Sequence, residues 1–308
     1  MRRVLAIINK WWECDPAMMA MLNDNARPAG SPWPNLLQPT RRRPDPRHLP
    51  PENPDPLPRA VFPYRNYSAE IWCISDLLEH LDPRFQSSSE QKAILLPKIF
   101  RKKPPADLVI AVGTAATPYD NPNQNGNVVV GSKIFMHDAH PGGSNPLSKW
   151  HGPFDRTIDS SIDPGFFEQL MRLDVATMTS RFLPVPLNSS SSPQLQEGFD
   201  NVGLATINVT DYSEYDAMDP LTLQSFIACG SEGRAASLET THGIIRVQSD
   251  SPFLFVSGIT DRLGRFDQDV APRSYSQDTA AAHNAGLVVS WLLYRFDQLI
   301  PHAALEEA

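Results

Sequence analysis

Cysteine is scarce in this sequence. Its 308 residues include three, Cys14, Cys73 and Cys229, and no two of them form a C-x-x-C pair. That count and spacing exclude the usual cysteine-based structural zinc site and give no disulfide framework. We therefore expect the protein to work in a reducing compartment.

Long apolar runs are missing as well. The run at the N-terminus, Val4–Ile8, is followed at once by Asn9 and Lys10, which makes it too short for the apolar core of a signal peptide. No other run approaches the roughly 18 residues needed to cross a bilayer. The sequence predicts a cytoplasmic protein with no membrane partner.

Basic residues are fewer than acidic ones: the sequence has 27 Lys and Arg and 35 Asp and Glu, which gives a net charge of −8. Binding to nucleic acid requires clustered Lys and Arg to neutralise phosphates, so a general nucleic-acid binder is excluded. The hydrophobic share of 41% is ordinary for a globular protein, and the length suffices for a large α/β core.

Proline is concentrated in one place, since twelve of the thirty prolines fall between residues 26 and 63. Proline fixes φ and removes a backbone donor, so no regular helix or central strand is expected there. We interpret residues 26–63 as an insertion, which also carries the basic cluster Arg41–Arg43. A lid, an arm around a neighbouring subunit, a partner-binding segment and a solvated loop all remain possible roles.

Outside this insertion, short apolar segments alternate with helical ones. Buried strands are predicted at Val4–Ile8, Asp107–Val112, Gly203–Tyr212 and Phe253–Ile259, with a strand pair over Asn127–His140. Helices are predicted at Asp15–Leu22, Ser87–Lys98, Asp163–Val175, from Glu239 and at Asp278–Leu299. Glu70–Leu78 is a mixed segment, in which Ser68 or Ser75 is a candidate cap for a helix that runs toward Leu81. Strands that are apolar on both faces and alternate with helices predict an α/β domain with a mostly parallel sheet.

Polar residues follow several of these strands, at the edge of the sheet where α/β proteins bind ligands. Glu13 and two tryptophans follow the first strand, and Thr260 and Asp261 end the strand after Glu239. The small residues Gly113–Ala116 follow another strand and would leave backbone N–H groups open to a ligand. Taken singly, Glu239 fits better as a solvated helix residue and Asp261 as the cap of the next turn, since acidic caps are common.

His137, Asp138 and His140 are residue types that bind metal ions. In an extended segment His137 points to one face, and Asp138 and His140 point to the other. No second cluster supplies further ligands, so we expect neither a metal nor a cofactor.

In this order the segments resemble the purine nucleoside phosphorylase and nucleosidase superfamily, most closely its methylthioadenosine/S-adenosylhomocysteine nucleosidase branch. The matching segments are Asp107–Ala116 (D-L-V-I-N-x-G-x-A-G in the family), Asn127–Ala139 (ending H-D-A), Ile207–Tyr212 (similar to S-G-D-x-F), Leu238-Glu239 (M-E) and Ile259–Asp261 (I-S-D). The resemblance covers about two thirds of the chain. It implies a three-layer α/β/α sandwich with a mixed, mostly parallel sheet, one domain over residues 1–308, and a homo-oligomer.

The resemblance also implies roles for individual residues. Leu238 and Glu239 would form the sugar site, with the carboxylate accepting both ribose hydroxyls. Asp261, held by Thr260, would protonate N7 of a purine as the glycosidic bond breaks. The other residues assigned to the substrate are Gly113, Thr114 and Ala115 beside the ribose, and Tyr212 or Tyr215 stacked on the base.

Departures from the family concern the nucleophile. Hexameric phosphorylases resemble G-D-P-x-R after the first strand and place a second arginine where this chain has Ala111; the hydrolases carry a further glutamate where it has Ser237. Phosphate requires cationic partners, so their absence favours water, with Glu13 as the base. Two alternatives remain: a phosphorylase that recruits phosphate through Arg65 or Arg41–Arg43, and an inactive nucleoside-binding or partner-docking module.

Overall fold

The computed structural model describes residues 2–23, 57–78, 89–138, 156–186, 192–207, 235–270 and 274–300. Its strands are β1 (Arg2–Ile8), β2 (Ala60–Pro63), β3 (Tyr67–Cys73), β4 (Leu108–Thr117), β5 (Val128–Gly131), β6 (Lys133–Asp138), β7 (Arg156–Ile158), β8 (Leu195–Glu197), β9 (Val202–Ile207), β10 (Ala235–Glu239) and β11 (Phe253–Arg262). The helices are α1 (Trp11–Asn23), α2 (Ile74–Leu78), α3 (Ser89–Phe100), η2 (Pro122–Gln124), α4 (Pro164–Leu170), α5 (Val175–Thr179), α7 (His242–Val247), η3 (Phe266–Val270) and α8 (Tyr275–Leu299). Among these, no helix is both long and apolar enough to cross a membrane.

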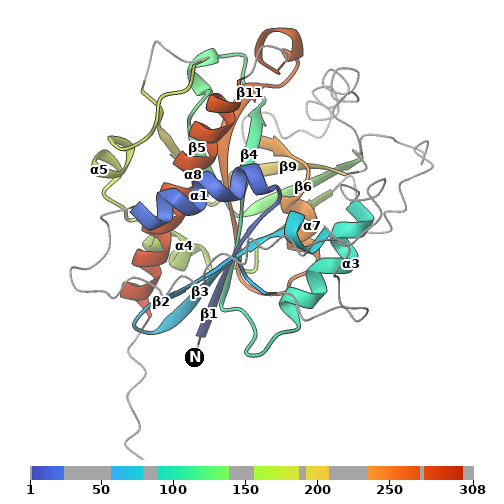
Figure 1. Cartoon of the computed structure of the whole chain (residues 1–308), viewed down its shortest axis with the longest axis vertical. Helices are drawn as coiled ribbons and strands as arrows, with labels where there is room; N and C mark the ends of the chain where they lie inside the picture. Colours follow the sequence, from blue (N-terminus) through green and yellow to red (C-terminus); the bar gives the residue numbers. More distant parts are fainter. Residues whose placement is uncertain are drawn as a thin grey trace, which may run out of the picture.

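The ten-residue strand β4 organises the sheet. Its first half pairs in parallel with β1, and its second half pairs antiparallel with β10 through Ala116 and Leu238. Along its other edge β4 pairs in parallel with β11. The eleven strands form one mixed sheet in which six of the ten strand pairs are parallel (Figure 1).

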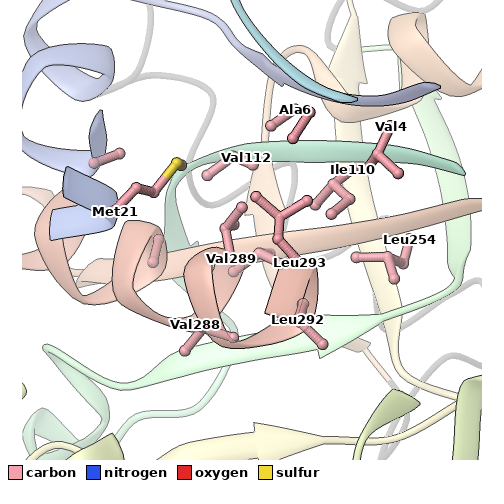
Figure 2. Packing of buried hydrophobic residues seen from close by; sticks show 14 of the residues in the cluster. Val4, Ala6, Met21, Ile110, Val112, Leu254, Val288, Val289, Leu292 and Leu293 are labelled. Carbon is pink, nitrogen blue, oxygen red and sulfur yellow. The ribbon is translucent and has the colours of Figure 1, made fainter. Parts of the chain in front are cut away.

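Helices cover both faces of this sheet. On one face α1 and α8 pack over β1, β4 and β11, and Figure 2 shows Val289 and Leu293 of α8 directed towards Val112 and Ile110 of β4. On the other face α3 and α7 cover the alternate residues of the same strands, among them Leu5, Val109 and Phe253. Because successive strand residues point to opposite faces, apolar runs of this kind fill both layers. The predicted α/β/α sandwich with a mixed sheet is confirmed.

Several predicted boundaries were wrong, and tertiary contacts explain why. In the mixed segment around Glu70, Tyr67–Cys73 form a strand that completes the sheet between β1 and β2, so the helix begins only at Ile74, near the second of the two candidate caps. Residues Gly113–Thr117 continue β4 instead of forming a loop, since β11 pairs with them over their whole length. Ser237–Glu239 form the end of β10, and the helix begins only at His242.

Helix α1 also begins earlier than predicted, at Trp11, so Pro16 lies inside it rather than at its first position. The Glu13 carboxylate explains the start. Its Oε2 accepts the backbone N–H of Lys10 at 3.0 Å, which satisfies one of the open donors of the first turn. Pro16 removes one hydrogen bond without ending the helix.

Most of the predicted proline-rich insertion lies outside the described residues. Its last part, Ala60–Pro63, forms the edge strand β2, which pairs antiparallel with β3. An edge position is where a strand tolerates proline, because one side of the strand needs no donors. The predicted helix at Asp163-Pro164 is confirmed, with the Asp163 side chain capping it, although it ends at Leu170.

Candidate active site

Glu13 lies at the carboxyl end of β1 and reaches across to β4. The β1–β4 ladder ends at Ile8 and Val112. Beyond it, Glu13 Oε1 accepts the backbone N–H of Thr114 at 2.9 Å and its hydroxyl at 2.7 Å. The predicted base is therefore a buried carboxylate fixed at both oxygens. Each carboxylate oxygen has two lone pairs, so a further donor such as water can still bind.

Glu239 is buried at the end of β10 and turns back onto the start of α7. Its Oε1 accepts the backbone N–H of His242 at 2.6 Å, and its Oε2 accepts that of Thr241. Burial raises the pKa of the Glu239 carboxyl to about 7, against the opposing effect of these two bonds. One lone pair on each oxygen stays available to a pair of hydroxyl donors.

Asp261 joins this group because of the way β4 is paired. Ala116 of β4 pairs with Leu238 on one side and with Asp261 on the other. With neighbouring strands about 4.8 Å apart, the backbones of Leu238 and Asp261 lie roughly 10 Å from each other. A bulge places Thr260 between two paired residues, and its hydroxyl donates to Asp261 Oδ1 at 2.5 Å.

The segments that carry the three predicted carboxylates thus lie beside one short stretch of β4. Glu13 binds Thr114, and two residues further on Ala116 separates the strands that carry Glu239 and Asp261. Two residues of strand span roughly 7 Å. Gly113, Thr114 and Ala115 form part of this stretch, within a strand instead of the predicted loop. Tyr212 and Tyr215 lie outside the described residues.

His242 and Lys92 also belong to this group, and sequence reasoning missed both. A Cβ on Gly113 would lie 3.4 Å from Glu13 Oε1 and 3.4 Å from His242 Nε2, so glycine leaves room for both side chains. Burial lowers the pKa of His242 to about 4, which keeps its ring neutral. Lys92 shares the buried side of α3 with Leu95, Leu96 and Ile99. The sequence did carry a signal for this burial, because Lys92 lies three and four residues before Leu95 and Leu96 and so shares their face of the helix.

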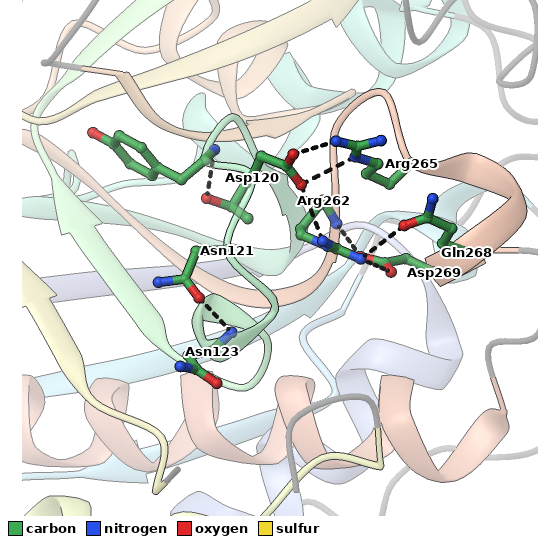
Figure 3. Close-up of polar contacts among 9 residues, drawn as sticks. Asp120, Asn121, Asn123, Arg262, Arg265, Gln268 and Asp269 are labelled. Atoms are coloured by element: carbon green, nitrogen blue, oxygen red, sulfur yellow. Dashed lines mark hydrogen bonds and ion pairs between the residues drawn. The ribbon is translucent and has the colours of Figure 1, made fainter. Parts of the chain in front are cut away.

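A charged cluster holds the segment that follows Asp261 (Figure 3). Arg262 donates from its backbone and from Nε to Asp269 Oδ2, at 2.9 and 2.8 Å, and from Nη2 to Oδ1 at 2.8 Å. Arg262 and Arg265 both bind Asp120, which follows β4. On the other side of Asp261, Gln277 of α8 donates to the Thr260 carbonyl at 2.5 Å. These contacts restrain the backbone on both sides of Asp261.

The structure places two of the positions that matter for the phosphorylase alternative, Arg65 and Ala111. Arg65 lies in the turn before β3, two residues before the end at which Tyr67 pairs with Arg2. Seven strand residues, or roughly 20 Å, separate that end of β1 from the end that leads to Glu13. Ala111 is buried within β4, between Ile7 and Phe255. Arg41–Arg43 lie outside the described residues.

Comparison with known proteins identifies the fold. The sequence matches no protein-family model and no curated protein. Among solved structures, the 5′-methylthioadenosine/S-adenosylhomocysteine nucleosidase from Helicobacter pylori is similar, with 11% identity and a TM-score of 0.54 over 95% of this chain and 98% of that chain. The chain has the nucleosidase fold.

Two further structures with this fold agree. The nucleosidase of the same kind from Neisseria meningitidis, solved in complex with methylthio-immucillin-A, is 14% identical, with a TM-score of 0.51 over 96% of this chain and 99% of that one. Futalosine hydrolase from Helicobacter pylori is 12% identical, with a TM-score of 0.53 over 97% of this chain and 98% of that one. The resemblance inferred from the motifs is confirmed at the level of the fold.

Proposed function

We propose that this chain is a nucleosidase, which hydrolyses the N-glycosidic bond of a purine nucleoside or nucleoside-like compound to free base and sugar. The observation that carries the proposal is that the segments carrying Glu13, Glu239 and Asp261 all lie beside the second half of β4. The nucleosidase fold supports it, since solved proteins with that fold are named as nucleosidases and as a hydrolase.

Each carboxylate has a part in this reaction. Glu239 accepts the two sugar hydroxyls through its remaining lone pairs, which orients the sugar. Asp261 gives a proton to the base as the bond to the sugar breaks, so the base leaves without a full negative charge. Glu13 takes a proton from the attacking water, and its two bonds to Thr114 aim the carboxylate.

The test is a screen of purine nucleosides for release of free base, with and without phosphate. Hydrolysis predicts release without phosphate. It also predicts that Asp261→Asn and Glu13→Gln each lower kcat about 10²- to 10⁴-fold. Asp267→Asn, at an exposed residue of η3, is the matched control and should leave the rate unchanged.

Three outcomes would contradict parts of this proposal. Release that requires phosphate and yields a sugar phosphate would make the chain a phosphorylase. Binding of nucleosides without release at high enzyme concentration would indicate an inactive module. An Asp261→Asn variant within about tenfold of the wild-type rate would remove the acid role from Asp261. The cytoplasmic location, the homo-oligomer and the single domain stay predictions.

A further inference from the structure

Lys92 is a cationic side chain in the interior. It is 2% exposed and comes from the middle of α3. An ammonium group removed from water is costly unless anions lie near it and its donors are satisfied. The groups around Lys92 should therefore include anions and hydrogen-bond acceptors that offset the cost of burying its ammonium group.

The contacts of Lys92 lead to the sugar-binding carboxylate. Lys92 Nζ donates a hydrogen bond of 2.9 Å to Thr241 Oγ1. The backbone N–H of the same threonine donates to Glu239 Oε2. One residue, Thr241, thus connects the ammonium of α3 to the carboxylate at the end of β10.

The charges around Glu239 come from several elements. Lys92 lies on α3, Glu13 lies on α1, and Lys10 directly precedes α1. Burial lowers the pKa of Lys92 to about 7. The charge of Lys10 lowers this pKa further, and the charges of Glu239 and Glu13 raise it. The neutral His242 of α7 completes the set, with Nδ1 3.8 Å from Glu239 Oε1. For Glu239 the attraction of Lys92 opposes burial. Lys92 is therefore the cation that favours an ionised Glu239.

We propose that Lys92 is a positioning residue of the sugar site: it holds Thr241 against Glu239 and supplies the positive charge that keeps this carboxylate ionised for a sugar diol. The inference rests on the proposed role of Glu239 in sugar binding. Loss of the charge should weaken substrate binding most at low pH, where Glu239 is protonated. A diol needs two acceptors, which only the ionised carboxylate provides.

The first experiment separates charge from packing. Lys92→Met removes the ammonium and keeps an unbranched side chain, Lys92→Arg keeps a charge, and Lys98→Met on the same helix is the control. With a nucleoside that the wild type hydrolyses, moving the Glu239 midpoint from about 7 to about 8 should raise KM of Lys92→Met about fivefold at pH 7 and about tenfold well below it. The value of kcat should change less than threefold, and KM should recover towards wild type at pH 9.

A rise in KM that is the same at every pH, or a Lys92→Arg variant as poor as Lys92→Met, would overturn the charge role. Thermal unfolding gives a further readout. Removing one partner of a buried charge pair leaves the other charge uncompensated, so Lys92→Met should lower the melting temperature, and more so above pH 7, where Glu239 is ionised. If it does not fold, Lys92→Gln takes its place.

The second experiment needs no activity. The carboxyl carbon of Glu239, assigned by its loss in Glu239→Gln, is titrated by NMR in the free protein. Its midpoint should lie about one pH unit higher in Lys92→Met, a tenfold change in proton affinity, and should not move in Lys98→Met. An unchanged midpoint overturns the inference. If no nucleoside is cleaved by the wild type, the proposed function fails while this titration still decides the role of Lys92.

Discussion

Glu13 accepts two hydrogen bonds from Thr114 through a single oxygen, one from the backbone N–H at 2.9 Å and one from the hydroxyl at 2.7 Å. Thr114 belongs to the central strand and Glu13 to the first turn of α1. The pair therefore attaches the helix to the sheet at the position proposed for the attacking water.

Removing the Thr114 hydroxyl should disturb the aim of Glu13 while leaving the fold intact. We expect Thr114→Val to lower kcat about ten- to a hundredfold, since a hydrogen bond to a charged group contributes about 1.5–3 kcal/mol. Thr114→Ser keeps the hydroxyl and is the matched control. Steady-state kinetics measures both variants, and equal rates for Val and Ser at position 114 would contradict the role.

The buried pair Glu239 and His242 makes opposite contributions to stability as pH changes. Folding lowers the pKa of His242 from 6.5 to about 4, so the unfolded chain binds the extra proton and His242 makes stability rise by about 3 kcal/mol between these pH values. Folding raises the pKa of Glu239 from 4.5 to about 7, so here the folded chain binds the proton and stability falls by about 3 kcal/mol as pH rises through that window.

The two contributions cancel over much of this range, and single variants should separate them. We expect Glu239→Gln to become more stable as pH rises from 4 to 6.5, and His242→Gln to become less stable as pH rises from 4.5 to 7. Urea unfolding at closely spaced pH values measures both. Profiles parallel to the wild type would show that neither group titrates as the structure implies.

Close packing of β11 on α8 depends on Gly258. A Cβ there would lie 2.1 Å from the carbonyl oxygen of Ala281, a backbone atom that cannot turn aside. We expect Gly258→Ala to destabilise the fold by about 1–3 kcal/mol or more through overpacking. Gly113→Ala is the comparison, because its new Cβ meets its neighbours at 3.4 Å. Chemical denaturation should show a clearly larger loss for position 258, and equal losses would contradict the packing argument.

Asp269 stabilises the segment after Asp261 through Arg262. Burial opposes its ionisation, but the bonds from the Arg262 side chain and backbone outweigh burial and lower the pKa of Asp269. Its contribution is present above the unfolded pKa near 4 and is lost as pH falls through the lower folded value. We expect Asp269→Asn to cost about 2 kcal/mol at pH 7.

The cost of Asp269→Asn should shrink towards pH 3, because below about pH 4 the unfolded chain takes up a proton at this carboxyl and the ionised folded form loses its advantage. Asp120→Asn is the control, since Asp120 binds the same arginine but is largely exposed. Surface ion pairs of that kind contribute little, so its effect should be small at both pH values. Urea unfolding at pH 7 and pH 3 gives the comparison, and a loss at position 269 that does not depend on pH would count against the ion pair.

The pattern of apolar and polar residues along the sequence was enough to predict the class of fold. Apolar runs such as Val4–Ile8 and Phe253–Ile259 need helices on both faces, and that requirement alone predicts a layered α/β protein. It was not enough for the segment around Glu70, where a strand competes with a helix. Pairing with β1 and β2 decided it, and pairing is a contact between residues far apart in sequence.

For the site, the sequence by itself determined which residue types were available: Glu13 after one strand, Glu239 before a helix and Asp261 near the end of another strand. Only the tertiary structure decided that their segments lie side by side, because β4 changes partner from β1 to β10 after Val112 and so brings three distant segments to Thr114 and Ala116. It also decided the place of Lys92, whose burial beside Thr241 depends on α3 packing over α7. The electrostatic environment and the burial of a side chain depend on groups that are close in space, so they cannot be read from the residues next to it in the sequence.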